Sequence, residues 1–168
     1  MKSKNVVDFW TKTVGIFPFK CGWTSLRNSL GTGGQILLED IPEGFRIIFC
    51  SRHPRTRFNS FWNSTIPQKN HPTLEIFAEA VLTGDLKNNP HAYPQSNYYD
   101  GEIDIHIKLE NIKTDYPSIK QYFIGAQNLL HENKSPTQED AWGQLSTSYQ
   151  DRLREYYDGD YIRFKYTD

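Results

Sequence analysis

Residues 20–26 read KCGWTSL, and they follow an apolar run at 14–19 that predicts a buried strand. A strand, a glycine-containing turn and then a helix is an arrangement by which α/β proteins hold phosphate. The first N–H groups of such a helix lack partners, and its positive end faces the anion. Gly22 lets the backbone approach a ligand closely, and Lys20 supplies a positive charge. This stretch therefore predicts an anion-binding corner in an α/β fold.

Two hydroxyl side chains follow the glycine. Thr24 and Ser25 can either cap the helix or bind phosphate oxygens. In the common nucleotide-triphosphate loop, G-x-x-x-x-G-K-[ST], the lysine follows the last glycine, whereas Lys20 precedes Gly22. The glycine-rich residues 31–34 are not followed by Lys-Ser or Lys-Thr either. An ordinary ATP or GTP site is therefore disfavoured, and a kinase-like phosphoryl transferase is an alternative with little support.

A second apolar run, at 45–51, predicts another buried strand that ends at Arg52. Pro54 suits the first position of a following helix, on which Ser60 lies further along. Arg52 through its guanidinium fork and Ser60 through its hydroxyl can converge on a single phosphate. The segment therefore predicts a second anion-binding element.

Together the two segments resemble the sulfotransferases that use 3′-phosphoadenosine 5′-phosphosulfate (PAPS), especially their carbohydrate, membrane-type branch. That superfamily has a K-x-G-x-[ST]-[ST] loop for the 5′-phosphosulfate and an R-x-P-x-x-R-x-x-S-like segment for the 3′-phosphate. This chain has matching residues at 20–25 and 52–60. Further segments similar to those of the branch, in the expected order, lie at 89–95, 107–112, 131–135 and 156–166.

The resemblance implies a reaction in which a sulfuryl group passes from PAPS to an acceptor hydroxyl, on a carbohydrate, and adenosine 3′,5′-bisphosphate (PAP) is released. No metal is expected. Lys20 would also be catalytic, because a cation beside the bridging oxygen of the leaving phosphate stabilises the charge that develops there. A non-catalytic nucleotide-binding protein on the same fold is the alternative. The resemblance assigns nucleotide binding to Lys20, Gly22, Trp23, Thr24, Ser25, Arg52, Ser60, Lys134 and Ser135.

A base is needed to take the proton of the acceptor hydroxyl. His91 is the expected base, since it matches the histidine of the family's N-x-H-x-x-P-Q and imidazoles change charge near neutrality. The alternative is that His91 fixes the conformation of its loop. For Lys134 and Ser135, the alternative to nucleotide binding is that they are ordinary loop residues. Glu110 and His106 are further candidates for the base. The alternative for Glu110 is an ion pair at the end of the strand, and the alternative for His106 is a place on the solvent-exposed face of the strand. Ala92 replaces a residue that is often Trp in the family, so the acceptor stays open.

Composition narrows the class of protein. The 168 residues predict a single domain, 1–168, and the 19 basic and 20 acidic residues indicate neither nucleic acid nor an anionic membrane as partner. The 14% of aromatic residues predict core packing, with a platform for the acceptor as the alternative. Cys21 and Cys50 are expected to be buried thiols. No segment is apolar enough for a membrane span or a signal peptide, so we expect a cytoplasmic protein of bacterial or viral type.

Strands separated by helices predict parallel pairing with right-handed crossovers. We expect a three-layer α/β/α sandwich of the P-loop nucleoside triphosphate hydrolase type around a mainly parallel sheet, with ligand beyond the carboxyl ends of the strands. Strands are predicted at 14–19, 35–38, 45–51 and 103–110. Helices are predicted at 5–11, 26–30, 54–62, 73–82, 117–130 and 147–157, and a Pro- and Asn-rich loop at 87–101.

Overall fold

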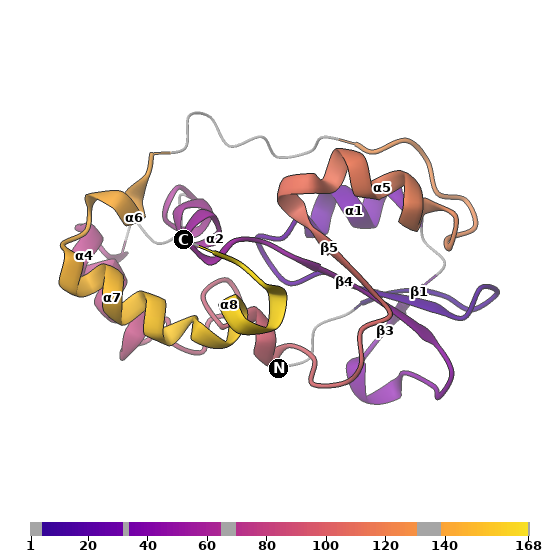
Figure 1. Cartoon of the computed structure of the whole chain (residues 1–168), viewed down its shortest axis with the longest axis horizontal. Helices are drawn as coiled ribbons and strands as arrows, with labels where there is room; N and C mark the ends of the chain where they lie inside the picture. The colour runs from indigo at the N-terminus through magenta and orange to yellow at the C-terminus, as the bar shows by residue number, and fades with distance from the viewer. Residues whose placement is uncertain (1–4, 32–33, 65–69, 131–138, 168) are drawn as a thin grey trace. The chain divides into compact units, whose positions relative to one another are not determined.

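The computed structural model describes residues 5–31, 34–64, 70–130 and 139–167. Helices and strands both occur along the chain, and the strands form one five-stranded sheet (Figure 1). The α/β class predicted from the sequence is therefore confirmed. Among the residues just named, no helix has the length and apolar composition needed to cross a membrane.

The structure divides into two compact units. The sheet unit comprises residues 1–52 and 99–134, and the helical unit comprises residues 53–98 and 135–168. Each unit has an apolar core of its own. The single domain predicted from the sequence stays a prediction, and the two units are described separately.

The sheet of the sheet unit has the order β3-β1-β2-β4-β5. Its strands are β1 (Asn5–Asp8), β2 (Thr13–Ile16), β3 (Gln35–Ile36), β4 (Arg46–Ser51) and β5 (Ile105–Lys108). β4 pairs in parallel with β2 and with β5, whereas β1 pairs antiparallel with β2 and with β3. The sheet is thus mixed, which corrects the prediction of a mainly parallel sheet.

The antiparallel half of the sheet arises at β1, where the sequence wrongly predicts a helix over 5–11. Val6 and Val7 are β-branched and suit a strand, and all four residues of β1 are buried. The turn that follows is fixed by Asp8, whose Oδ1 accepts hydrogen bonds from the N–H groups of Trp10 and Thr11. After this short turn the chain runs back beside β1 as β2. The residues of β1 therefore pair with β2 and do not form the predicted helix.

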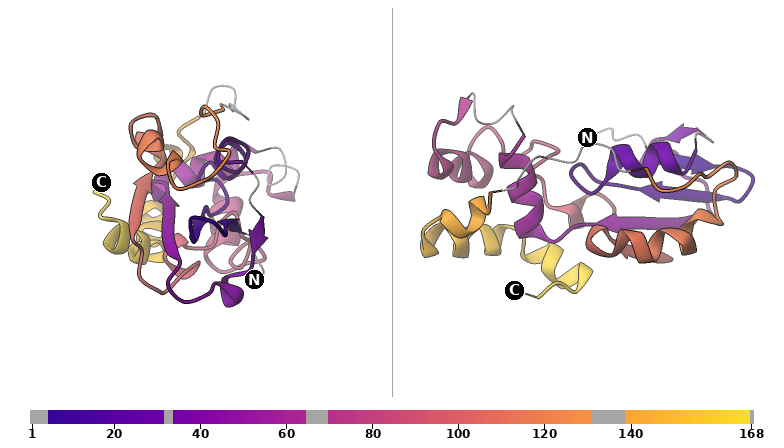
Figure 2. Two further views of the ribbon diagram at one scale, coloured as in Figure 1. Left: turned by 90° about the vertical axis from the view of Figure 1, so that its right-hand side faces the viewer. Right: turned by 90° about the horizontal axis from the view of Figure 1, so that it is seen from above.

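Two helices of the sheet unit, α1 (Trp23–Ser29) and α5 (Ile112–Lys120), pack on the same face of the sheet (Figures 1 and 2). The core beneath them contains Leu26, Leu30, Ile48, Cys50, Ile107 and Ile119. The three-layer arrangement stays a prediction. Short 3-10 turns lie at η1 (Leu38–Asp40) and η3 (Leu109–Asn111).

The helix predicted over 117–130 is wrong at both ends. α5 begins at Ile112, directly after η3, and Pro117 lies inside it. The helix ends at Lys120, and turns follow to Gly125, which has a φ of +86° that a right-handed helix cannot contain. The apolar residues beyond Lys120 therefore belong to a loop.

The helical unit has a largely aromatic core built on Phe58, Phe61, Phe77, Trp142 and Tyr157. Its elements are α2 (Pro54–Trp62), α4 (Leu74–Leu82), η2 (Gln95–Asn97), α6 (Ala141–Gln144), α7 (Thr147–Tyr156) and α8 (Asp158–Phe164). The helices predicted at 54–62, 73–82 and 147–157 are confirmed, and Thr73 caps α4 through a hydrogen bond from the N–H of Ile76. α8 is a helix that the sequence does not predict.

Candidate functional site

Three neighbouring parallel strands, β2, β4 and β5, end at one edge of the sheet. The segments that follow them are the loop at 17–22, Arg52 and η3. Ligands of open α/β sheets bind beyond the carboxyl ends of such strands. The residues predicted to hold the 5′-phosphosulfate therefore lie at an edge that suits a ligand site.

The loop between β2 and α1 is shaped by two residues with positive φ. Gly22 has a φ of +78° and is the N-cap of α1. The left-handed backbone conformation favours glycine, and a Cβ at this position would lie 2.7 Å from Cδ1 of Leu109, so that the leucine side chain would have to shift. Lys20 has a φ of +67°, which is uncommon for a residue with a side chain and occurs often at functional sites.

The first turn of α1 holds Trp23, Thr24 and Ser25. Gly22 is the N-cap of α1, and no side chain among the described residues caps the helix. Helix capping, one of the two roles expected of Thr24 and Ser25, is therefore not observed. Thr24 is exposed. The backbone N–H groups of a first turn have no acceptor within the helix, so this turn is chemically suited to an anion. The binding of phosphate oxygens thus remains the prediction for both hydroxyls.

Arg52 joins the end of β4 to this loop. Its Nη1 donates a hydrogen bond to the backbone carbonyl of Lys20, with a donor–acceptor distance of 3.1 Å. Two residues that the sequence assigns to different phosphates of one nucleotide are therefore in contact. Both residues are only partly buried, and the contact joins the guanidinium of Arg52 to the backbone of Lys20.

A second polar pair joins Ser51, the last residue of β4, to His106 in β5. Oγ of Ser51 and Nε2 of His106 lie 2.8 Å apart in a hydrogen bond. Ser51 is buried and His106 is exposed. Glu110, the other candidate base of this unit, is exposed in η3. The sequence does not predict Ser51, because its contact with His106 depends on the parallel register of β4 and β5.

The two cysteines are buried thiols, as expected. Burial raises the pKa of the Cys50 thiol well above its ordinary value. Electrostatic interactions with Cys21, Glu110 and Asp115 raise this pKa further, whereas the positive charge of Arg52 lowers it. The neutral thiol is a poor nucleophile. Cys50 therefore packs in the core and is not a candidate catalytic group.

In the helical unit, α2 carries Arg57 and Ser60, and both are buried. Arg57 is only 1% exposed, and its Nη2 donates to the carbonyl of Pro90 at 3.1 Å. The second arginine of the sulfotransferase-like pattern thus holds the loop that contains His91. The binding of a 3′-phosphate by Ser60 stays a prediction.

His91 lies in a well-anchored loop. Its N–H donates to Oδ1 of Asn89 at 2.9 Å, and its ring stacks on Phe61 with 5.3 Å between ring centroids and 22° between planes. Tyr156 and Tyr157 each donate a hydroxyl bond of 2.8 Å to this loop, at the carbonyls of residues 87 and 92. Burial raises the pKa of Tyr157, which keeps its hydroxyl a donor. The imidazole is therefore held in a fixed orientation.

Asp160 ties the loop to α8. Its carboxylate is fully buried and accepts hydrogen bonds from the N–H of Gln95 at 2.9 Å, the side-chain amide of Gln95 at 3.1 Å and the N–H of Ser96 at 2.6 Å. Two of the segments on which the resemblance rests, 89–95 and 156–166, therefore meet inside the helical unit. No local pattern in the sequence predicts this pairing.

Lys134 and Ser135, which the resemblance assigns to nucleotide binding, lie outside the described residues. Across the described parts of the chain, no group of three or more His, Cys, Asp or Glu side chains is arranged to hold a metal ion. The candidate site therefore consists of the loop at 20–25, Arg52, the pair of Ser51 and His106, and Glu110 in η3.

Comparisons of the chain with family models, with curated proteins and with solved structures give no match. The resemblance to sulfotransferases consequently rests on the order and spacing of the motifs. The function that follows from it is a proposal, to be judged by the geometry above and by experiment.

Proposed function

We propose that this protein is a PAPS-dependent sulfotransferase that acts on an acceptor hydroxyl, expected on a carbohydrate. The observation that carries the proposal is the hydrogen bond from Nη1 of Arg52 to the carbonyl of Lys20, 3.1 Å long, at the carboxyl edge of β2 and β4. It brings together a loop suited to a phosphosulfate and an arginine suited to a second phosphate.

The donor's chemistry matches this arrangement. PAPS carries two separate anionic groups, the 5′-phosphosulfate and the 3′-phosphate. Two residues with cationic side chains, Lys20 and Arg52, follow the adjacent strands β2 and β4 and are joined by a hydrogen bond. A guanidinium forms paired, charge-assisted bonds with phosphate, whereas an ammonium acts as a point charge. Arg52 is therefore assigned to the 3′-phosphate and Lys20 to the phosphosulfate. Ser60 and the pair at 134–135 keep their assigned roles as predictions.

The proposed reaction is an in-line transfer. The acceptor oxygen forms a bond to sulfur while the bond between sulfur and the bridging oxygen of the phosphate breaks, and PAP leaves with the electron pair. The acceptor proton goes to a base, for which His91 is the first candidate. Lys20 would stabilise the negative charge that develops on the bridging oxygen, a contribution that lowers the barrier because it is strongest in the transition state.

A binding experiment separates this proposal from its alternatives. Calorimetric titration without magnesium should show PAP binding about tenfold or more tighter than AMP or ADP, because a charge-assisted hydrogen bond contributes roughly 1.5–3 kcal/mol. Equal affinity for AMP, or a strict magnesium requirement, would contradict the nucleotide assignment.

A transfer experiment then tests the reaction itself. Labelled PAPS is incubated with panels of glycans, phenols and lipids, and labelled products are separated. Transfer to a glycan supports the full proposal, and transfer to a phenol or a lipid alone corrects the acceptor class. Tight PAP binding with no transfer to any acceptor would indicate a non-catalytic nucleotide-binding protein.

A further inference from the structure

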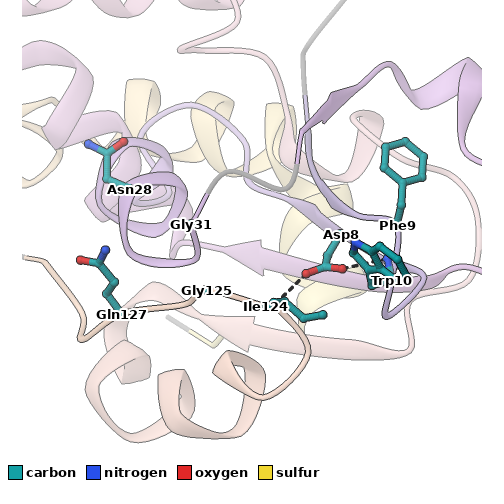
Figure 3. Close-up of a pocket in the computed structure, with 8 residues that line it drawn as sticks. All are labelled: Asp8, Phe9, Trp10, Asn28, Gly31, Ile124, Gly125 and Gln127. Carbon is teal, nitrogen blue, oxygen red and sulfur yellow. Dashed lines mark hydrogen bonds between the residues drawn. The ribbon is translucent and has the colours of Figure 1, made fainter.

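The sheet unit has a pocket of about 720 Å³ that the proposed function does not use (Figure 3). Asp8, one of the residues that line it, ends β1 and pairs with Thr13, the first residue of β2. Asn28, another, lies near the end of α1, the helix that starts at Gly22. The pocket therefore lies at the amino edge of the parallel strands, about 20 Å from the carboxyl edge for a six-residue strand such as β4.

The walls of the pocket are held together by Asp8. This side chain is 3% exposed. Its Oδ1 accepts from the N–H groups of Trp10 and Thr11 at 3.0 and 3.1 Å, and its Oδ2 accepts from the N–H of Ile124 at 2.6 Å. One buried carboxylate thus fixes both the β1–β2 turn and the loop after α5. Two segments that line the pocket, the β1–β2 turn and the loop after α5, are therefore tied to one buried anchor.

One end of the pocket is an apolar wall that faces solvent. Trp10 is 88% exposed, Ile124 is 63% exposed and Phe9 is 56% exposed, and all three line the same pocket. The ring of Phe9 is supported by an edge-to-face contact with Phe45 at 6.1 Å and 78°. Exposed large apolar side chains that gather in one place mark a binding surface. The negative face of an indole attracts the polarised C–H groups of a ligand.

The other end of the pocket is polar and uncharged. Figure 3 shows Asn28 and Gln127 at the end away from Phe9 and Trp10. The primary amide of Gln127 offers both donors and an acceptor, which suits hydroxyl groups. Among the described residues that line the pocket there is one carboxylate, Asp8, and no Lys, Arg or His. The lining therefore offers no cation to neutralise an anionic ligand.

We infer that this pocket binds a neutral carbohydrate, with the C–H face of one sugar ring on Trp10 and hydroxyl groups on Gln127. A volume of about 720 Å³ lies within the range of small-ligand sites, roughly 300–1,000 Å³, and has room for a short oligosaccharide. The pocket lies at the opposite edge of the sheet from Lys20 and Arg52, so it binds the sugar without taking part in group transfer. The inference does not rest on the proposed function.

The test uses the full chain and neutral oligosaccharides, namely maltohexaose, cellohexaose and N-acetylchitotetraose, in calorimetric titrations. At least one should bind, and Trp10→Ala should weaken it by tenfold or more, because the substitution removes the exposed ring. Gln127→Ala should weaken it several-fold. Two matched controls, Ile162→Ala and Gln144→Ala, remove an exposed apolar residue and an exposed amide from the helical unit and should leave the affinity unchanged.

Three outcomes would overturn the inference. The first is no binding of any of the three oligosaccharides at millimolar concentration. The second is equal affinity in wild type and Trp10→Ala. The third is a wild-type dimer in analytical ultracentrifugation that Trp10→Ala converts to monomer, which would make the apolar wall a contact between copies. PAP affinity, measured in parallel, should be the same in Trp10→Ala and wild type, so failure of the nucleotide proposal is seen separately.

Discussion

Nη1 of Arg52 donates a hydrogen bond to the backbone carbonyl of Lys20, 3.1 Å away. The bond links the end of β4 to the loop that follows β2, across two adjacent strands. Arg52 therefore has two effects at once: it contributes positive charge and it positions the loop. The side chain of Lys20 takes no part in this bond, because the acceptor is its backbone carbonyl.

The first prediction is that substitutions at the two residues have different kinetic effects. Lys20→Ala should lower turnover by about 10²–10³, the usual loss for one stabiliser of developing charge, and change PAP affinity much less. Arg52→Ala should weaken PAP binding first. Steady-state kinetics and calorimetry check this. Lys120→Ala, which removes the same charge near the end of α5, is the control. Identical kinetic effects at positions 20 and 52 would contradict the division of roles.

The second prediction concerns the glycine at the start of α1. Gly22 and Gly44 share a φ of +78°, but a Cβ at Gly22 meets Leu109 at 2.7 Å and a Cβ at Gly44 meets nothing within 4 Å. Gly44→Ala should lower the free energy of unfolding by about 1–2 kcal/mol, the cost of a left-handed residue. Gly22→Ala should cost about 1–3 kcal/mol more, from overpacking.

Urea unfolding of the two variants measures the difference. The double variant Gly22→Ala with Leu109→Ala should be more stable than the sum of the single effects predicts, because the clash is then absent. Equal destabilisation by Gly22→Ala and Gly44→Ala would show that packing against Leu109 does not restrict the loop.

The parallel strands β2 and β4 can be predicted from the sequence, because each is an apolar run that is followed by a residue typical of a turn or of a helix start. β4 falls within the run at 45–51, and Pro54 begins α2 at the expected position. β2 overlaps the run at 14–19, but it begins at Thr13 and ends at Ile16. Gly22 marks the turn before α1 in the same way. Local chemistry is enough to place these residues at the carboxyl edge.

Pairings between distant segments cannot be predicted in this way. β1 has only four residues, and its apolar pair Val6 and Val7 suits a helix as well as a strand until β2 pairs with it. The contact of Ser51 with His106 depends on strand register. The bond between Gln95 and Asp160 joins residues 65 positions apart. Each of these three contacts depends on how distant segments pair in the folded chain, which no local sequence pattern predicts.

The third prediction is that Asp160→Asn destabilises the protein by about 2–4 kcal/mol. The carboxylate accepts three hydrogen bonds in a fully buried position, and an amide would turn one acceptor into a donor that faces donors. Gln95→Ala removes the side-chain bond only and should cost about 1 kcal/mol. Asp158→Asn, at an exposed pair with Arg154, should change stability by less than about 1 kcal/mol. Urea denaturation checks all three, and a harmless Asp160→Asn would contradict the anchoring role.

The fourth prediction is a dependence of stability on acid pH through Asp140. The hydrogen bond from Arg55 is the main cause that lowers the pKa of Asp140 to about 2, and burial opposes it. Hydrogen bonds from Asn59 and from the N–H of Gly143 contribute to the same lowering. Because the folded pKa is below the unfolded value of about 3.9, this carboxylate stabilises the fold above pH 4. The contribution is lost as the pH falls from about 4 to about 2.

Urea unfolding between pH 2 and 6 checks this dependence. Asp140→Asn should flatten the acid side of the stability profile, and the effect should be modest because both partners are about half exposed and solvent screens them. Asp151→Asn, at an exposed position of α7, is the control and should follow the wild-type profile. An unchanged acid slope in Asp140→Asn would show that the pair with Arg55 contributes nothing to folding.

The last prediction is that His91 is the base for the acceptor hydroxyl. Its ring is stacked on Phe61 and its backbone is held by Asn89, so the imidazole is fixed before the acceptor binds. His91→Ala should leave PAP affinity intact and lower turnover by roughly 10²–10⁴, and the acidic limb of the pH–rate profile should vanish. His91→Gln should not restore turnover, because an amide accepts no proton near neutrality. Near-normal turnover in His91→Ala would reduce His91 to a loop anchor and leave Glu110 and His106, the latter already bonded to Ser51, as the candidate bases.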